Sequence, residues 1–451
     1  MTTEMWHRLN SRLLFAFLTM LIVVPGGYAL PPLLCLGAFL IAALTGALAA
    51  GWRTSRLDWE DGLWCLALLA FAASWLGDVA RTLKWPESAT GNGIGLPLWP
   101  VVGAAALIGL RCHAPSARHW WLGLSCGAVA AGSIALFERL VLAYSRASND
   151  MNAIPFGNLA LLLGFLSCLA TLWWLYRLPR LQPSCRCRCL WLSAAGGMAG
   201  MMASLLSGTR GGWLAVPLLV SLLYMAWQQI PTRKERLRLV TRYMGAGALL
   251  LTIILLAIPE TGVSQRLAGA VADAQEYWQG EDRDGSVGLR LEMWRGGLQL
   301  FVERPWTGWG EGRLETARDA LVANHILHPG VSYYDQLHSD IIDTAARRGV
   351  VGLLGLVLLY GVPIYLFSRR LGCSSPGVRI LAMSGLMITL AFLIFGLSQS
   401  MLRDVHGLSG YLGLSIGCWV ILKREERRAL CQASTGAGRR YAAEAFVGKP
   451  R

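Results

Sequence analysis

A histidine and a small set of arginines are the side chains in this sequence best suited to chemistry. Arg210 lies in the turn 207–212, where the glycines at 208, 211 and 212 let the backbone and the guanidinium approach a headgroup closely. A guanidinium is planar, binds phosphate through two parallel hydrogen bonds and stays charged near lipid. His338 can accept a proton, since the unperturbed pKa of histidine, about 6.5, is near working pH. These residues predict that the protein holds an anionic group beside a base.

Membrane helices must position these residues, because the rest of the sequence is strongly apolar. Of its 451 residues 54% are hydrophobic and 15% are charged, and the mean hydropathy is +0.45. A helix needs about 20 apolar residues to cross a bilayer. Such segments predict an all-α polytopic membrane protein with about twelve transmembrane helices. They centre on residues 11–30, 31–51, 61–80, 96–112, 119–144, 153–176, 189–208, 211–230, 243–260, 349–367, 378–402 and 409–423.

The basic residues that give the chain its net charge of +14 are unevenly divided between alternate loops. Most lie on one side, including the run from Arg233 to Arg242 and a tail that begins at Lys423. Because positive charge resists translocation, both termini are expected to be cytoplasmic. The basic stretches are short and juxtamembrane, so nucleic acid is not an expected partner. The short loops opposite hold only Arg81, Lys84, Arg146, Arg210 and Arg403.

One loop is too long to be a simple connector. From residue 261 to residue 348 hydropathy collapses, and helix parity places this stretch on the external face. The expected domains are therefore transmembrane helices one to nine (1–260), a large, mainly helical periplasmic loop (261–348), helices ten to twelve (349–423) and a cytoplasmic basic tail (424–451).

Two helices are expected inside this loop. Ser286 can cap a helix that runs through Trp294 and ends at Glu303. A second helix is expected to open near Asp335 and to hold His338 in its first turn. There the helix macrodipole disfavours the imidazolium, so the ring is expected to remain neutral and able to accept a proton.

Three stretches of this sequence form a recognisable pattern at their relative spacing. They are Ser207-Gly208-Thr209-Arg210-Gly211-Gly212-Trp213, then Arg290 through Trp294 to Arg304-Pro305-Trp306-Thr307-Gly308-Trp309-Gly310-Glu311-Gly312, and then Leu337-His338-Ser339-Asp340 through Arg348-Gly349-Val350-Val351-Gly352. Together they resemble the O-antigen ligase and polymerase superfamily of bacterial envelopes over roughly residues 200–425. The first 190 residues match that superfamily only in hydropathy.

Within the superfamily, the sequence looks most like a ligase that joins a finished O-antigen chain to lipid A-core. The resemblance implies a glycosyltransferase of the bacterial inner membrane, with a C-type fold, that works on the periplasmic face. Such an enzyme takes the glycan from undecaprenyl pyrophosphate and passes it to a sugar hydroxyl of lipid A-core. The resemblance also implies that membrane lipids are partners and that the enzyme needs neither a metal nor another cofactor.

For this chemistry Arg210 is the best candidate ligand of the pyrophosphate. Arg290 ranks second, because the family pattern also places an arginine there. Arg403 ranks third, since it lies at the membrane boundary on the expected external side. Arg139 follows Glu138 near the external end of the fifth expected span, where an ionisable group usually faces a cavity or a partner.

His338 is the expected general base of this reaction. Asp335 or Asp340 is expected to orient the ring through its other nitrogen. Trp294 lies four residues after Arg290, so both side chains are expected on the same helix face.

Two rival sites are open on the sequence alone. Asp282-Arg283-Asp284 has the D-x-D spacing that many sugar transferases use to hold a divalent ion, although it reads most simply as a solvated loop. His325, His328 and His338 are a possible zinc set with poor spacing for one helical face.

Two rival functions are also open. An O-antigen polymerase or a protein-glycosylating oligosaccharyltransferase would share the donor, the arginines and the fold. A lipid or solute transporter is a more distant alternative, because the halves show no convincing repeat.

Overall fold

The computed structural model describes residues 3–44, 57–86, 95–177, 183–228 and 285–434, and all regular structure in these ranges is helical. The elements are α1 (Thr3–Met20), α2 (Leu30–Leu44), α4 (Trp59–Thr82), η1 (Leu96–Leu98), α5 (Trp99–Cys112), α6 (Ala117–Leu136), η2 (Phe137–Val141), α7 (Ala153–Arg177), α8 (Pro183–Ser207), α9 (Arg210–Trp213), α10 (Val216–Gln228), α13 (Ser286–Glu303), α14 (Arg313–Ala323), η5 (Pro329–Tyr333), α15 (Asp340–Ser368), α16 (Pro376–Ser398), η6 (Met401–Arg403) and α17 (Val405–Ser434).

The described helices form a multi-pass membrane bundle. Eight of them are long and apolar enough to cross a bilayer, and two shorter apolar helices, Leu30–Leu44 and Leu96–Cys112, coincide with expected spans. The all-helical membrane class is therefore confirmed, whereas the count of twelve is not. The expected span 243–260 lies outside the described residues.

The end of the first expected span is wrong, and helix α17 reaches into the expected tail. Helix α1 ends at Met20 rather than near residue 30, because the Pro25-Gly26-Gly27 turn follows and Gly26 has a φ of +73°. Helix α17 continues to Ser434, so the first residues of the expected tail are helical.

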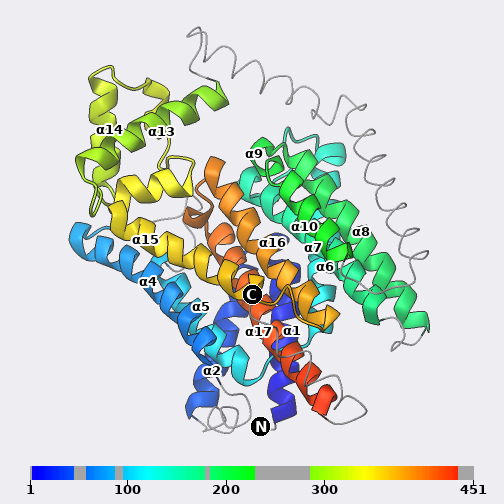
Figure 1. Ribbon diagram of the computed structural model, residues 1–451. Coiled ribbons are helices and arrows are strands. Elements are labelled where there is room, and N and C mark those ends of the chain that lie inside the picture. Colours follow the sequence, from blue (N-terminus) through cyan, green and yellow to red (C-terminus); the bar gives the residue numbers. More distant parts are fainter. Residues whose placement is uncertain (1–2, 45–56, 87–94, 178–182, 229–284, 435–451) are drawn as a thin grey trace.

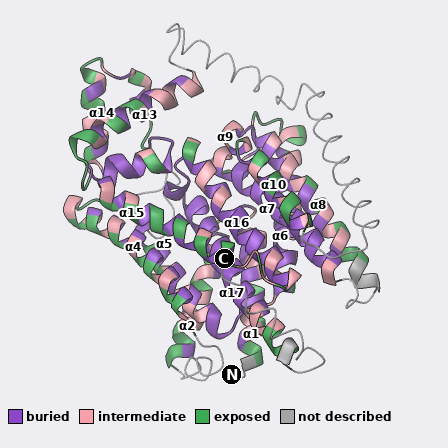
Figure 2. Ribbon diagram, in the orientation of Figure 1, coloured by how far each residue is buried: buried purple, intermediate pink, exposed green. Residues whose placement is uncertain are grey.

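Helix α7 is the most completely buried of the eight candidate spans. Of its most apolar stretch, 94% is buried, and it packs against α6, α8 and α16 (Figures 1 and 2). Glycine allows a close backbone contact between α7 and α8: a Cβ on Gly200 of α8 would lie 2.5 Å from the carbonyl oxygen of Ala160 in α7. Small residues of this kind let membrane helices pack backbone to backbone.

Helices α13 and α14 form a separate layer at one end of the bundle, while the start of α1 and the end of α17 lie at the other (Figure 1). This layer has its own small core, which includes Met293, Leu300, Leu314 and Leu337. Helix α13 spans Ser286–Glu303 as expected, although its N-cap residue is Gly285.

The second expected loop helix is wrong. Residues Pro329–Tyr333 form a 3₁₀ turn, and α15 begins only at Asp340, with Ser339 as its N-cap. His338 therefore precedes the helix instead of lying in its first turn. Its φ of +49° is left-handed, which is incompatible with a helical position.

A kink at Gly349 joins the loop to the bundle. Gly349 has φ +61° and ψ −154°, so α15 is interrupted there and backbone groups on both sides are released from the helix. The turn that follows α13 pairs with them: Trp309 and Gly310 donate to the carbonyls of Ala346 and Arg347 at 2.9 and 2.8 Å. On the other side of the kink, the amide of Val350 donates to the carbonyl of Pro305 at 2.7 Å.

We expect Gly349→Ala to destabilise the protein by roughly 2 kcal/mol or more, because its backbone region is nearly restricted to glycine. In addition, a Cβ at residue 349 would lie 2.4 Å from the carbonyl oxygen of Pro305. Thermal unfolding in detergent measures the effect. Gly361→Ala, in the same helix with nothing within 4 Å of its Cβ position, is the control. Equal melting temperatures for the two variants would contradict the role of the kink.

Candidate functional site

A basic cavity lies at the end of the bundle under α13. Its volume is about 260 Å³, and it is lined by residues from the segment before α7, the α8–α9 turn, α13 and the end of α16. The lining residues are Arg146, Ile154, Gly208, Thr209, Arg210, Gly211, Arg290 and Ser398. They comprise three arginines and no carboxylate, so the wall favours an anion.

The turn that presents Arg210 is held by close packing on its glycines. A Cβ on Gly211 would lie 2.1 Å from Ser398 Oγ, and one on Gly212 would lie 2.1 Å from Asn158 Oδ1. Thr209 Oγ1 donates to the carbonyl of Ala153 at 3.0 Å. Larger residues in this turn would push α9 away from α7 and α16. The expected tight turn between two spans is therefore present.

Arg290 comes to the same cavity from α13, as the sequence predicts. Its pKa is lowered by burial and by the positive charge of Arg210, and is raised by Tyr334. Each guanidinium thus disfavours the charge of the other, and a bound anion would relieve this repulsion.

Arg146 is the third arginine of the wall, and sequence reasoning did not select it. Its Nε donates to the carbonyl of Ser207 at 2.8 Å, so the side chain is fixed against the turn that presents Arg210. The sequence could have indicated it, because Arg146 is one of the few basic residues in the short loops expected on the external side.

His338 is not among the lining residues, but it is buried, with 8% of its surface exposed, and lies close enough to Arg290 for that charge to act on its ring. Its Nδ1 lies 2.6 Å from Oε1 of Gln399, the residue after the cavity-lining Ser398. An amide oxygen only accepts, so Nδ1 bears the proton and Nε2 keeps its lone pair. The ring of Tyr334 packs edge-on at 5.1 Å.

Burial, rather than a position inside a helix, keeps this histidine neutral. Burial lowers the pKa of His338, the hydrogen bond to Gln399 raises it, and the charge of Arg290 lowers it further. The net effect places its pKa below the usual value, so the ring is neutral at pH 7 and able to accept a proton.

The supporting residues expected from the sequence do not form the hydrogen bond that orients the ring of His338. Asp340 Oδ1 accepts from the amide of Leu402 at 2.9 Å, and so fixes the segment after α16. Asp335 is exposed, its carbonyl accepts from Arg347, and the charge of its carboxylate acts to raise the pKa of His338. The contact that orients the ring of His338 is made by Gln399. Trp294 lies partly buried against the core of the loop layer.

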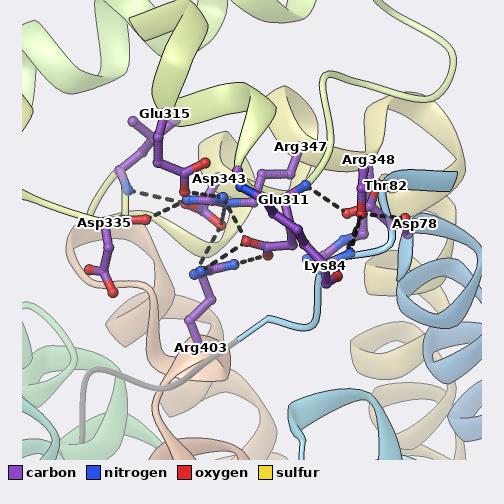
Figure 3. Close-up of polar contacts among 12 residues, drawn as sticks. Asp78, Thr82, Lys84, Glu311, Glu315, Asp335, Asp343, Arg347, Arg348 and Arg403 are labelled. Carbon is purple, nitrogen blue, oxygen red and sulfur yellow. Dashed lines mark hydrogen bonds and ion pairs between the residues drawn. The ribbon is translucent and has the colours of Figure 1, made fainter. Parts of the chain in front are cut away.

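Arg403 does not line the cavity but belongs to a buried cluster of ion pairs (Figure 3). Its guanidinium pairs with Glu311, and its Nε lies 3.7 Å from Asp343 Oδ2. At the centre of the cluster, Arg347 contacts Asp343 at 3.0 Å, Glu311 at 2.9 Å and Glu315 at 2.6 Å.

The cluster holds Glu311 firmly in its ionised form. Burial opposes ionisation, but the charges of Arg347 and Arg403 outweigh it and lower the pKa of Glu311 to about 2. The stabilisation from this carboxylate is therefore present above the pKa of an unfolded glutamate, about 4.3, and is lost as the pH falls toward 2.

The same cluster reaches helix α4. Asp78 accepts from the amide of Glu311 at 3.1 Å, and Arg81 donates to the carbonyls of Thr307 and Gly308 at 2.8 and 2.9 Å. Arg348 stacks over Trp75 at 4.1 Å. The loop turn is thereby fastened to α4, α15 and η6 together.

Arg139 lies in the π-helical turn η2 and donates to the carbonyl of Tyr144. It is not among the lining residues of the cavity. Its neighbour Glu138 accepts from the amides of Ser148 and Asn149 at 2.7 and 2.9 Å, which shapes the segment that holds Arg146.

The rival metal sites gain no geometric support. Asp282 and Asp284 lie outside the described residues. His328 Nδ1 accepts from the amide of Gly330 at 3.2 Å, which makes it a cap of η5. Within the described part of the chain, no three histidine, cysteine, aspartate or glutamate side chains are grouped as a metal site.

Comparison with known proteins bears on this geometry. Residues 194–357 match the model of the O-Antigen ligase family. The resemblance to the O-antigen ligase family is confirmed over these residues. An uncharacterised protein of Haemophilus influenzae is 24% identical over 297 residues, which are 65% of this chain and 70% of that protein. The matched segment contains Arg210, Arg290 and His338 together with the loop turn and Arg347.

The match indicates a domain of the O-antigen ligase and polymerase family over residues 194–357. Enzymes of this family are glycosyltransferases that use lipid-linked glycans, and the apolar helices agree with a multi-pass membrane protein. The match leaves out Arg146, which lines the cavity, Gln399, which contacts His338, and Arg403, which belongs to the cluster of ion pairs.

We expect Glu311→Gln to destabilise the protein by about 3 to 5 kcal/mol, the usual cost of breaking a buried ion pair. Arg347 and Arg403 both pair with Glu311, so the substitution would leave buried positive charge on each without one of its carboxylate partners. Thermal unfolding in detergent checks this. Glu303→Gln, at the exposed end of the neighbouring helix α13, should leave the melting temperature unchanged. A Glu311→Gln protein as stable as this control would contradict the assignment.

Proposed function

We propose that this protein is an O-antigen ligase, which transfers a finished polysaccharide from undecaprenyl pyrophosphate to a sugar hydroxyl of lipid A-core. The observation that supports this most is the cavity with three arginines near a buried, neutral histidine. The family match supports the donor class, a lipid-linked glycan.

The proposed orientation places the α13–α14 layer in the periplasm and both termini in the cytoplasm. The basic residues support it, since they concentrate in the loops at the opposite end of the bundle. Within the described residues, the α13–α14 layer lies in sequence between the helices that end at residue 228 and the span after the Gly349 kink, which supports the proposed loop domain between two sets of spans.

The cavity is proposed to hold the pyrophosphate of the donor. Arg210 and Arg290 face it from the bundle and from the loop, and Arg146 adds a third guanidinium. The wall would neutralise the charge that grows on the leaving phosphate oxygen in the transition state. Protein side chains would supply this charge neutralisation.

His338 is proposed to activate the acceptor. Its Nε2 takes the proton of the acceptor hydroxyl while the hydroxyl oxygen attacks the anomeric carbon of the glycan. The bond from that carbon to the phosphate oxygen breaks, and undecaprenyl pyrophosphate leaves with the electron pair. Gln399 keeps the ring in the required tautomer through the 2.6 Å contact to Nδ1.

A polymerase or a protein-glycosylating enzyme would use the same donor site, so the acceptor decides between them. The assay is transfer from the lipid-linked glycan by the purified protein, with lipid A-core, a second lipid-linked glycan or pilin offered in parallel. Transfer to lipid A-core supports the ligase. Lengthening of the polymer alone would contradict it.

We expect His338→Ala to lower kcat by about 100-fold or more, because a positioned general base contributes on the order of 10² to 10⁴ in rate. Donor binding should be retained, since the arginines remain. Single-turnover transfer and binding of undecaprenyl pyrophosphate measure the two effects separately. His325→Ala changes an exposed histidine of the same loop and should transfer normally. Undiminished transfer by His338→Ala would exclude this residue as the base.

We also expect Arg290→Gln to move the acidic limb of the kcat profile to higher pH. The charge of Arg290 lowers the pKa of His338, so its removal raises that pKa and leaves the base protonated over a wider range. The measurement is kcat against pH at saturating donor. Arg295→Gln, an exposed change on the same helix, serves as the control. An unshifted limb in Arg290→Gln would show that the two residues are not coupled.

A further inference from the structure

A second basic cavity lies at the opposite end of the bundle from the α13–α14 layer. Its volume is about 280 Å³, and its wall is formed by the start of α1, the end of α5 with the residues after it, and the end of α17. The start of α1 and the end of α17 lie together in Figure 1, far from α13 and α14. This cavity therefore has no part in the proposed transfer reaction.

One face of α17 supplies most of the positive charge. Arg424, Arg427, Arg428 and Cys431 all line the cavity, and their spacing of three and four residues places them along one side of the helix. Arg111 of α5 adds a further guanidinium.

Some carboxylates at this end of the bundle pair with arginines of the cavity, and others pair elsewhere. Glu425 pairs with Arg428 at 2.9 Å. Glu60 pairs with Lys423 at 2.6 Å and with Arg370, on another side of α17. Asp61 holds Arg111 at 2.8 Å from inside the bundle, with 2% of its surface exposed. The residues that line the cavity include four arginines and no aspartate or glutamate, so positive charge predominates in its wall.

Contacts within the protein fix the side chains and helix ends that form this cavity. Arg424 donates to the carbonyl of Ala114, and His7 Nδ1 lies 3.1 Å from the same carbonyl. The end of α17 and the start of α1 are thus tied to one loop after α5. Side chains that are fixed in this way lose less freedom when they bind a ligand.

The cavity also lies at the level expected for lipid headgroups. Trp59 is 59% exposed at the start of α4, and Arg369 lies 5.7 Å over its ring. Exposed tryptophans mark the membrane interface. The neighbouring Glu60 pairs with Lys423, the residue before Arg424, so the arginines of the cavity lie near this level.

We propose that this cavity binds the phosphate group of an anionic phospholipid from the leaflet at that end. Guanidinium groups bind phosphate oxygens through paired hydrogen bonds, and anionic leaflets attract juxtamembrane basic residues. A water molecule takes about 30 Å³ in the liquid, so the cavity has the volume of several water molecules. That is enough for a phosphate group and part of the headgroup alcohol attached to it. A bound phosphate would join α1, α5 and α17, and so would stabilise the bundle.

The test uses the full-length protein, purified in detergent and supplied with phosphatidylglycerol or phosphatidylcholine. Native mass spectrometry measures retained lipid, and thermal unfolding measures stabilisation. We expect the unchanged protein to retain phosphatidylglycerol in preference to phosphatidylcholine. Arg424→Gln/Arg427→Gln should weaken that retention about tenfold or more, because charge-assisted contacts to the phosphate are lost.

A control removes the same charge from the same end outside the cavity. Arg12→Gln/Arg118→Gln changes two exposed arginines and should retain phosphatidylglycerol normally. Arg427→Gln alone tests the site if the double variant does not fold, and should weaken retention in the same direction. Equal retention by the cavity variants and the control would overturn the proposal. Stabilisation by inorganic phosphate without retention of phosphatidylglycerol would overturn the lipid assignment.

Discussion

The buried ion pairs around Arg347 are the interaction on which the arrangement of the candidate site depends. Arg347 comes from the short helical stretch before the Gly349 kink, Glu311 from the loop turn, and Arg403 from the turn after α16. These groups are costly to bury singly and become compatible with burial only when they meet. The cluster therefore specifies one position of the loop layer relative to the spans.

This constraint explains why the site has two halves. The bundle supplies Arg210 in a glycine turn packed on α7 and α16, and the loop layer supplies Arg290 and His338. Neither half forms a closed cationic wall alone. The Gly349 kink and the Pro305–Gly310 turn exchange backbone hydrogen bonds, so the loop meets the bundle through main chain as well as through charge.

Much of this could be predicted from local patterns in the sequence. Apolar length predicted the membrane helices, glycine spacing predicted the turn at Arg210, and residues 286–303 were predicted as a helix. Arg210 and Arg290, both selected from stretches that resemble a known family, line the same cavity.

What could not be predicted depends on contacts between distant segments. Arg403 looked like a phosphate ligand at a membrane boundary, yet its partner Glu311 lies 92 residues earlier in the chain. Gln399 orients His338 across 61 residues, whereas the sequence suggested nearby aspartates. The helix expected near Asp335 fails because the backbone at His338 is left-handed, a local conformation set by tertiary packing.

The central claim is that the cluster holds the loop so that Arg290 acts together with Arg210 on one anion. A double-mutant cycle on binding of undecaprenyl pyrophosphate, with Arg210→Gln and Arg290→Gln, measures this cooperation directly. The account predicts a coupling free energy of about 1 kcal/mol or more when Glu311 is present, and its loss in a Glu311→Gln background. Additive effects in the protein with Glu311 intact, or a coupling that persists unchanged without Glu311, would contradict the account.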